Sequence, residues 1–474
     1  METININGNK WIKERGSEGQ EVYTALQLIE EEKILGTYAD KESYDILIDK
    51  DADLYFPPEY DLHKKNNNTD YSDENRVAFK FRKNVFTPEE QKGAFEGLYD
   101  AAAESHNRGL AAGPKTEKLA GREWVTPYQY DVLEFFMNSQ PRSIDGSDTL
   151  RDIKEKHKNN DIKNTRGFCW LRDRVEEVYP EYDNFFPKLI KKLLKMPVYE
   201  ATEYATMVRD VWVSKTTYAA GLWSGIAGFY GRYPRIPYGR ATSYTQCNPG
   251  KFSKCYPFAR KLESEFKKLL PKRHSAQEAY ANRLDNNFLI GEDTTFTTIT
   301  VNTTTKDRNA RMACHRDAGS LNAGYSNLTV ITKDNKDWKG GYLVVPEVRM
   351  AINVRPGDLL LIDNMKVIHG NTPISAPDSG EEDLLRMSLV FYFREDMDNL
   401  GSWEYEQFRK QFVDDRRNNK DHKLWKNYWN GVSPKMFEEK EWYEYLEKKG
   451  GKEMVTKYHP DAYKQKTSLE SFFK

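Results

Sequence analysis

The sequence predicts an α+β fold: a double-stranded β-helix, or jelly roll, with flanking helices. Residues 288–395 consist of short β-branched and apolar runs separated by Gly and Asn turns, a pattern typical of a closed or double-sheet β structure. Helical patterns lie before and after this stretch. The chain has 474 residues, 38% of them hydrophobic, which is enough to bury such a core together with additional elements.

The elements before the core are predicted as follows. Residues 1–75 are acidic and irregular, and we expect an N-terminal accessory segment ending in the polar linker KKNNNTDYSDEN. Residues 76–400 form the main domain, with helical support over 87–287 and the jelly roll over 288–395. The helical patterns begin with a strong start signal, because Thr87 and Glu90 flank Pro88 as a capping box. The predicted elements are a strand at 76–86 and helices at 88–106, 126–138, 182–196 and 255–270, with a surface insertion at 139–167. Residues 401–474 are predicted to form C-terminal helices packed on the core.

Composition excludes several classes of protein. No apolar run approaches the roughly 18 residues of a membrane span, and the N-terminus lacks the apolar segment of a signal peptide. The four cysteines contain no C-x-x-C pair, which argues against a zinc module or a disulfide framework and fits a reducing cytosol.

Charge is unevenly distributed although the net charge is −1. Residues 1–60 carry 6 Lys/Arg and 14 Asp/Glu, whereas residues 188–283 carry 18 Lys/Arg and 6 Asp/Glu. The basic segment is compatible with a polyanionic partner, and equally with solvated faces of ordinary helices.

A histidine–aspartate pair follows the strand-like run FTTITVNTTT (296–305). In a strand, residues i and i+2 face the same side, so His315 and Asp317 can both point inward while Arg316 points away. A second pair, His459 and Asp461, encloses a proline, which is unfavourable in a central strand.

His369 completes the candidate metal site. It follows a turn at 356–358 and a buried strand at 359–362, and it begins the next strand. Two imidazoles and one carboxylate are the ligands of non-haem Fe(II) oxygenases, in which three iron positions stay open.

A co-substrate site is predicted beside it. 2-Oxoglutarate binds iron through its keto group and one carboxylate, and its far carboxylate needs a fixed cation. Arg386, in the strand-like run RMSLVFYF, offers a forked, permanently charged donor, and Ser388 lies on the same face. Arg311 and Asn302 are weaker candidates for the near end. We therefore expect His315, Asp317, His369 and Arg386 to be the catalytic residues, with Fe(II), 2-oxoglutarate and O2 as cofactors.

Three stretches together resemble the TET/JBP dioxygenases. They are H-x-D-x-G within ACHRDAGS, then G-G-x-L-x-x-P-E, and then G-D-x-L-L-x-D with the later H-G. The likeness covers about 110 residues strongly, and NRGLAAG and residues 240–273 extend it weakly. The resemblance implies a jelly roll, iron ligation by His315, Asp317 and His369, and a co-substrate anchor of Arg386 and Ser388.

The resemblance also implies a substrate and a setting. Family members oxidise the methyl group of 5-methylcytosine or thymine in DNA, and a base inside a duplex must be flipped out to reach a buried iron. For that base we expect contacts from Asn107, Arg108, Ser320 and Arg240. The alternative for Asn107 and Arg108 is an ordinary helix-terminating loop. The alternative for the region of Arg240 is an aromatic loop packed over the barrel. The expected partner is DNA, and we expect a monomer without membrane contact.

The chain departs from the family in ways that leave alternatives open. It lacks the cysteine-rich zinc region of the animal enzymes, so it looks more like a phage or microbial member, and we expect a cytoplasmic protein, or a nuclear one in a eukaryote. Ser320 stands where base-J enzymes often have Asp, which leaves base selectivity open. An oxygenase acting on another substrate, a relative that uses ascorbate, and a non-enzymatic reader of modified bases are the competing hypotheses.

Overall fold

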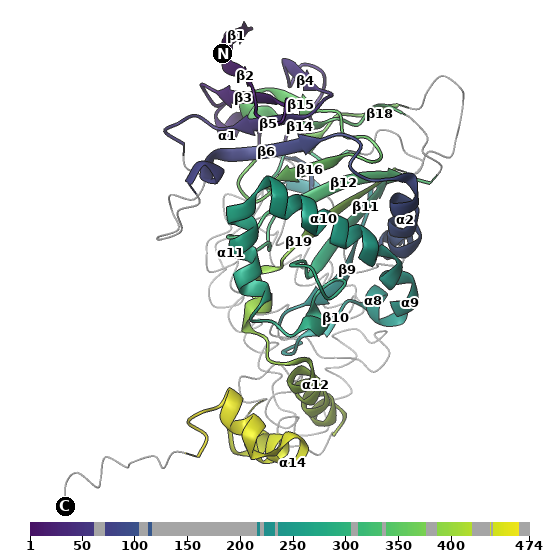
Figure 1. Ribbon diagram of the computed structural model, residues 1–474. Helices are drawn as coiled ribbons and strands as arrows, with labels where there is room; N and C mark the ends of the chain where they lie inside the picture. Colours follow the sequence, from purple (N-terminus) through teal and green to yellow (C-terminus); the bar gives the residue numbers. More distant parts are fainter. Residues whose placement is uncertain are drawn as a thin grey trace, which may run out of the picture. The chain divides into compact units, whose positions relative to one another are not determined.

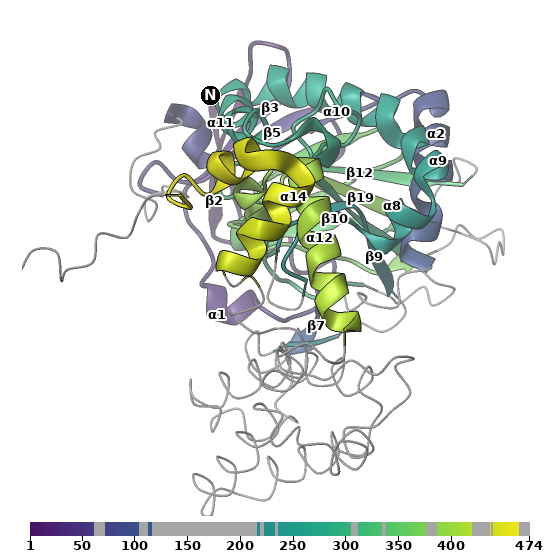
Figure 2. The same ribbon diagram turned by 90° about the horizontal axis from the view of Figure 1, so that it is seen from below.

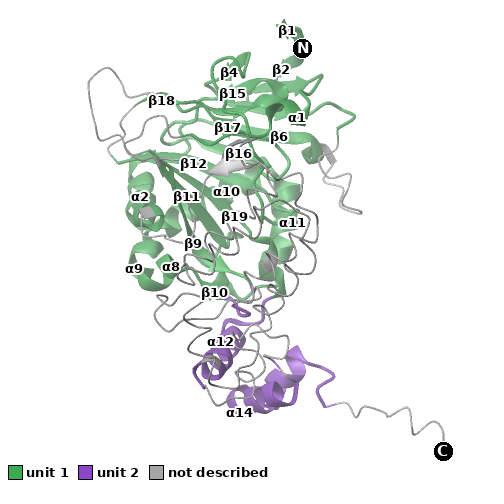
Figure 3. Ribbon diagram, turned by 180° about the vertical axis from the view of Figure 1, so that it is seen from behind, with its two compact units in different colours: residues 1–119, 214–231, 240–399 green, residues 120–213, 232–239, 400–474 purple. Residues whose placement is uncertain are grey.

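The chain is described by a computed structural model, in which two compact units are distinguished (Figure 3). Unit 1 comprises residues 1–119, 214–231 and 240–399, and unit 2 comprises 120–213, 232–239 and 400–474. The structure describes residues 1–60, 72–103, 112–115, 216–218, 222–232, 236–304, 311–333, 338–375, 386–419, 437 and 439–463. The helices predicted at 126–138 and 182–196 and the insertion at 139–167 lie outside them.

Unit 1 contains the predicted jelly roll. Its strands are β11 (Thr298–Thr304), β12 (Ser326–Thr332), β13 (Lys339–Gly340), β14 (Leu343–Val345), β15 (Met350–Ile352), β16 (Leu359–Ile362), β17 (Gly370–Asn371), β18 (Ile374–Ser375) and β19 (Arg386–Tyr392). One sheet has the order β16-β12-β19-β11 and a second has the order β17-β14-β15, all with antiparallel neighbours. The chain alternates between the two sheets, and side chains of both share one buried cluster, as a double-stranded β-helix requires.

Helices cover the outer face of the larger sheet (Figures 1 and 2). They are α2 (Pro88–Ala103), α8 (Ser243–Cys247), α9 (Pro249–Phe252), α10 (Tyr256–Leu269) and α11 (Pro271–Ala281). The predicted capping box is confirmed, because the N–H of Thr87 donates to the Glu90 carboxylate (2.8 Å) and the N–H of Glu90 to Thr87 Oγ1 (3.3 Å). The apolar face of α10 packs on the sheet, where Phe258 meets Phe391 of β19 with ring centroids 6.1 Å apart. Because both faces of the sheet are covered, every residue of β12, β16 and β19 is buried, and their sequences are mostly apolar or β-branched rather than alternating.

The expectation of an irregular N-terminal segment was wrong. Residues 1–60 form β1 (Glu2–Ile6), β2 (Asn9–Arg15), β3 (Glu21–Ala25), α1 (Glu31–Ile34), β4 (Ile46–Ile48) and β5 (Ala52–Tyr55). Through β6 (Val77–Arg82), which pairs with β16, strands β1, β2, β3 and β5 extend the larger sheet, while β4 pairs with β15 in the smaller one. These short strands are stabilised by long-range pairing with the barrel, which an acidic local composition does not reveal.

The remaining elements complete the two units. In unit 1, β9 (Leu222–Tyr230) and β10 (Arg240–Ala241) lie at the other end of the larger sheet. A separate two-stranded sheet consists of β7 (Ala112–Lys115) and β8 (Thr216–Tyr218). Short 3-10 turns are η1 (Ser72–Arg76), η3 (Ser253–Cys255), η4 (Asn286–Phe288), η5 (Pro346–Val348) and η6 (Glu395–Asn399). None of the described helices is long and apolar enough to cross a membrane.

Unit 2 contains the two predicted C-terminal helices, α12 (Trp403–Asn418) and α14 (Glu439–Tyr458). They share a buried cluster that includes Tyr405, Phe412 and Trp442. His459 contacts the Tyr405 hydroxyl (2.9 Å) and the Trp442 indole N–H (3.1 Å). The histidine of the second pair, His459 and Asp461, therefore has a structural role between these two helices. Packing of these helices on the jelly roll stays a prediction.

Candidate metal centre and co-substrate pocket

Three side chains converge in unit 1, where His369 is buried and His315 and Asp317 are partly exposed. One ligand atom each from His315, Asp317 and His369 lies within 4.8 Å of the other two. Asp317 Oδ1 is 3.2 Å from His315 Nε2 and 3.9 Å from His369 Nε2. The structure thus brings together the three residues that the sequence singled out.

Hydrogen bonds fix the imidazoles in the orientation that a metal needs. His315 Nδ1 lies 2.7 Å from the Ala313 carbonyl, and His369 Nδ1 lies 3.1 Å from the Val367 carbonyl. A carbonyl only accepts, so each Nδ1 carries the proton and each Nε2 keeps its lone pair. Both lone pairs are therefore available to a cation, the usual arrangement of metal-binding histidines.

The charges of the site favour a divalent cation. Burial alone raises the pKa of Asp317, but hydrogen bonding to His315 and the nearby imidazoles outweigh it and lower this pKa to about 2. Burial, together with the charge of His315, lowers the pKa of His369 to about 4. Burial also disfavours the charged form of His315, yet its bond to Asp317 raises its pKa above the ordinary value. Around neutral pH the site holds an ionised carboxylate and at least one neutral imidazole.

Backbone pairing sets the spacing of the ligands. His315 and His369 form an antiparallel bridge with reciprocal N–H···O bonds of 2.9 Å. Gly370 permits this approach, because a Cβ there would lie 3.0 Å from Cys314 Sγ and 3.1 Å from the Cys314 nitrogen. Cys314 is buried in an apolar cluster, and burial raises its thiol pKa to about 11. After Asp317 the chain turns at Gly319, whose φ is +86°.

A pocket beside the ligands contains all four residues predicted for the co-substrate. Its lining consists of Leu222, Asn302, Arg311, Met312, Asn371, Ile374, Arg386 and Ser388. Asn302 and Ser388 are register partners on β11 and β19. Asn371 lies two residues after His369, and its N–H donates to the Met312 carbonyl (3.2 Å). The pocket therefore opens next to the ligand-bearing segments.

Arg386 is a buried cation at this pocket, with 7% of its surface exposed. Burial, with Arg355 nearby, lowers its pKa to about 10, so it stays charged at neutral pH. Both guanidinium groups contact the Trp338 indole, with the Arg355 group 4.5 Å and the Arg386 group 5.8 Å from the ring centre. A buried, charged guanidinium beside Ser388, in a pocket of mixed polar and apolar lining, suits a dicarboxylate.

Ser320 and Arg240, predicted as substrate contacts, belong to one cluster in unit 1. Ser320 forms a bridge with Arg394, and the guanidinium groups of Arg394 and Arg240 each lie 4.8 Å from the ring centre of Tyr230. We call Tyr230, Arg240, Ser320 and Arg394 the rim cluster. Its Ser320 follows the ligand Asp317 by three positions in the chain.

Two further sequence-based expectations concern contacts with DNA, and the structure supports neither directly. Asn107 and Arg108 lie outside the described residues. The basic segment 188–283, in its described part, has most of its cations within 4 Å of carboxylates, as in Lys251–Asp100 and Lys254–Glu96. Arg273 of the same segment is fully buried against Asp363. The positive charge of segment 188–283 therefore supports binding of a polyanionic partner less strongly than the sequence alone indicates.

Sequence reasoning missed several residues of the site. Asn371 lines the pocket, and Asn364 donates from Nδ2 to the Asp317 carboxylate (2.9 Å). Asn371 could have been found from its i+2 spacing to His369. Arg394 is 77 residues away from Asp317 and carries no local signal.

Comparisons with known proteins find similarity over part of the chain. Residues 230–395 match the Tet_JBP family, described as the oxygenase domain of the 2OGFeDO superfamily. The chain is 32% identical over 174 residues to the bifunctional helicase and thymine dioxygenase JBP2 of Leishmania braziliensis, covering 36% of this chain and 14% of that protein. It is 30% identical over 190 residues to the thymine dioxygenase JBP1 of the same organism, covering 40% and 21%. The chain thus spans about a fifth or less of these relatives' lengths.

Among solved structures, one match is NgTET1 in complex with 5mC DNA. It shares 15% identity, covers 38% of this chain and 64% of its own, and has a TM-score of 0.29. The cofactors of the superfamily are Fe(II), 2-oxoglutarate and O2. The residues present fit them, because two histidines and one aspartate form the donor set beside a pocket with a buried arginine.

Proposed function

We propose that this chain, whose residues 230–395 form an oxygenase domain of the Tet_JBP family, hydroxylates the C5-methyl group of a pyrimidine in DNA. 5-Methylcytosine and thymine are the two candidate bases, and the named relatives are thymine dioxygenases. The observation that carries the proposal is the approach of three ligand atoms within 4.8 Å beside the pocket of Arg386 and Ser388.

In this proposal the protein holds its cofactors with a small set of residues. His315, Asp317 and His369 bind Fe(II) through the two Nε2 atoms and one carboxylate oxygen. Arg386 and Ser388 bind the far carboxylate of 2-oxoglutarate, and Asn302, Arg311 and Asn371 line the same pocket. When bound, iron with 2-oxoglutarate and O2 supplies the oxidising power for insertion of one oxygen atom into a methyl C–H bond.

The residues of the pocket also favour binding of 2-oxoglutarate in one orientation with little loss of solvent from the protein. The buried guanidinium of Arg386 has lost most of its water already, so an incoming carboxylate replaces little solvent on the protein side. A forked donor with Ser388 beside it would hold the far carboxylate of the dicarboxylate in a defined orientation.

A methyl group stacked inside a duplex cannot reach a buried metal. The base must leave the stack, at a cost of a few kcal/mol, and its edge must then be recognised by polar groups near the iron. We infer that the rim cluster contains groups of this kind, because an Arg guanidinium (Arg394) and a Ser hydroxyl (Ser320) can each donate a hydrogen bond to a base edge. Within the described residues no carboxylate lies in ion-pair distance of Arg394.

An oxygenase of a free small molecule is the second candidate, because the paired cations of segment 188–283 weaken the case for a polyanion. Nucleoside mass spectrometry separates the two. DNA containing 5-methylcytosine or thymine is incubated with the protein, Fe(II) and 2-oxoglutarate, with Asp317→Ala as control. Hydroxymethylated nucleosides that appear only with the intact protein support the proposal. Consumption of 2-oxoglutarate that DNA does not stimulate, without an oxidised base, would move the substrate away from DNA.

A further inference from the structure

Arg316 separates His315 from Asp317, and its guanidinium contacts groups on the outer side of the site, although these three residues lie outside the strands and only His315 forms an isolated bridge. Its guanidinium makes three contacts on the outer side of the site. Nη1 lies 2.7 Å from the Glu31 carboxylate, Nη2 donates to Glu347 Oε1 (3.1 Å), and Nε donates to the Lys366 carbonyl (2.8 Å). The side chain thus connects the His315–Asp317 segment to the chain that leads into His369.

Glu347 lies on the η5 turn and is 4% exposed. Its two oxygens have different partners: Oε1 accepts from Arg316, and Oε2 accepts from the Ile368 backbone N–H (2.8 Å). Ile368 directly precedes His369. A single buried carboxylate therefore holds both ligand-bearing segments at once, from the side opposite the ligand atoms.

Burying the Glu347 carboxylate costs free energy, so the contacts that compensate for this cost are important for the stability of the arrangement. A buried carboxylate is tolerated only when hydrogen bonds and an opposite charge compensate for its lost hydration. Here both oxygens are used, and each partner is one residue from a ligand. A change at Glu347 leaves at least one buried donor without its acceptor, and the displaced donor belongs to a ligand segment.

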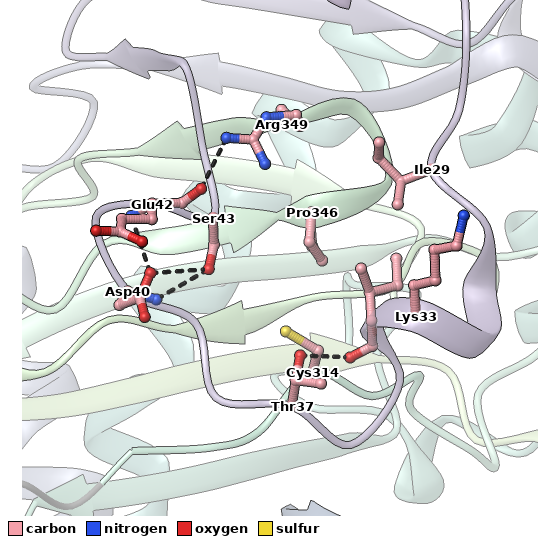
Figure 4. Close-up of a pocket in the computed structure, with 10 residues that line it drawn as sticks. Ile29, Lys33, Thr37, Asp40, Glu42, Ser43, Cys314, Pro346 and Arg349 are labelled. Carbon is pink, nitrogen blue, oxygen red and sulfur yellow. Dashed lines mark hydrogen bonds between the residues drawn. The ribbon is translucent and has the colours of Figure 1, made fainter. Parts of the chain in front are cut away.

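The N-terminal segment supports the chain that leads into His315 from outside. The Gly36 N–H donates to the Cys314 carbonyl (2.7 Å), the Cys314 N–H donates to the Thr37 carbonyl (2.8 Å), and Arg311 Nη1 donates to the Ala39 carbonyl (2.9 Å). Figure 4 shows Thr37 beside Cys314 at the bottom of the small pocket that this segment encloses. These contacts reach only the segment that carries His315 and Asp317, whereas Glu347 bonds to Arg316 and to the Ile368 amide beside His369.

We propose that Glu347 is a positioning residue of the metal centre, which acts through Arg316 and the Ile368 amide and, together with the backbone bridge between His315 and His369, holds the His315–Asp317 pair in place against His369. The inference rests on the proposed metal-binding function of these three ligands. Outer contacts of this kind typically change metal affinity by about 10- to 100-fold.

The test uses the full chain and Co(II) as a spectroscopic probe under anaerobic conditions. Co(II) affinity and the shape and intensity of its visible absorption are measured for the wild type, Glu347→Gln and Arg316→Lys. The introduced glutamine keeps the size of the side chain but only one acceptor oxygen, and the introduced lysine keeps the charge but not the fork. We expect both variants to bind Co(II) about 10- to 100-fold more weakly, with an altered spectrum.

Two controls separate positioning from general stability and from failure of the site itself. Asp53→Asn breaks another buried ion pair of unit 1, with Arg82 (2.7 Å), and should lower stability while leaving the Co(II) spectrum unchanged. His315→Ala should abolish specific binding, and if it does not, the proposed metal site fails. If His315→Ala abolishes binding while Glu347→Gln and Arg316→Lys retain wild-type affinity and spectrum, the positioning role is overturned. Arg316→Lys decides the matter if the Glu347 variant does not fold.

Discussion

Asn364 and Asp317 hold each other through two hydrogen bonds. Asn364 Nδ2 donates to Asp317 Oδ2 (2.9 Å), and the Asp317 N–H donates to the Asn364 carbonyl (2.9 Å). The second carboxylate oxygen, Oδ1, faces both imidazoles. Asn364, itself 1% exposed, therefore leaves one oxygen of Asp317 for a metal and holds the other.

Replacing Asn364 by Ala should weaken metal binding about 10- to 100-fold, because the carboxylate loses the contact that orients it. Anaerobic titration with Co(II) measures this change. The exposed Asn287, which bonds only to Asp285 among the contacts described, provides a matched control as Asn287→Ala. Equal affinities for the two variants would show that the amide does not orient the ligand.

Arg386→Lys should raise the dissociation constant for 2-oxoglutarate roughly 10- to 100-fold, equivalent to losing one charged hydrogen bond of about 1.5–3 kcal/mol. Metal affinity should stay close to that of the wild type, because Arg386 is not among the ligands. Calorimetric titration of the Co(II)-loaded protein with 2-oxoglutarate checks both. Arg283→Lys, whose guanidinium stacks on Tyr280, is the control. Unchanged co-substrate binding in Arg386→Lys would place the anchor elsewhere.

Metal affinity should fall as the pH decreases through the raised pKa of His315. This imidazole must be neutral to bind a cation and is protonated below its pKa, whereas His369, with a pKa lowered to about 4, is already neutral. Below the His315 pKa the affinity should decrease about tenfold per pH unit, since one proton is displaced. Co(II) titrations between about pH 6 and about pH 8 test this. A slope of two protons, or of none, would contradict the assignment.

The buried pair Arg273–Asp363 (3.0 Å) should dominate stability near the site. Asp363→Ala is expected to cost about 3–5 kcal/mol, because it leaves a fully buried guanidinium without its counter-charge. The double variant Arg273→Met, Asp363→Leu should lose less than the sum of its single changes.

Urea unfolding of the metal-free protein measures these free energies. Glu265→Ala, which removes the more exposed Lys261–Glu265 pair, should cost less than about 1 kcal/mol. Similar losses for Asp363→Ala and Glu265→Ala would mean that burial of the first pair has no energetic consequence.

The barrel and its ligands were predictable because their signals are local. Period-two spacing places His315 and Asp317 on one face, and a turn followed by an apolar strand places His369. Arg386 and Ser388 share a strand face for the same reason. Each of these residues could therefore be recognised from the sequence immediately around it.

Other features depend on contacts that sequence spacing does not encode. The strands of residues 1–60 are stabilised by pairing with β6 and β15, far along the chain. Arg394 meets Ser320, and Glu347 meets Ile368, only because the jelly roll brings distant segments together. Such pairs become visible when the sheet register is known.

The most direct test of the central claim is the fate of molecular oxygen. DNA with 5-methylcytosine, or with thymine as its only methylated base, is incubated with the full chain, Fe(II) and 2-oxoglutarate under 18O2, and nucleosides and succinate are analysed by mass spectrometry. The account predicts a hydroxymethyl pyrimidine with one 18O atom and succinate with the other, both absent with Asp317→Ala. Labelled succinate without any oxidised base, for either DNA, would contradict a DNA methyl hydroxylase.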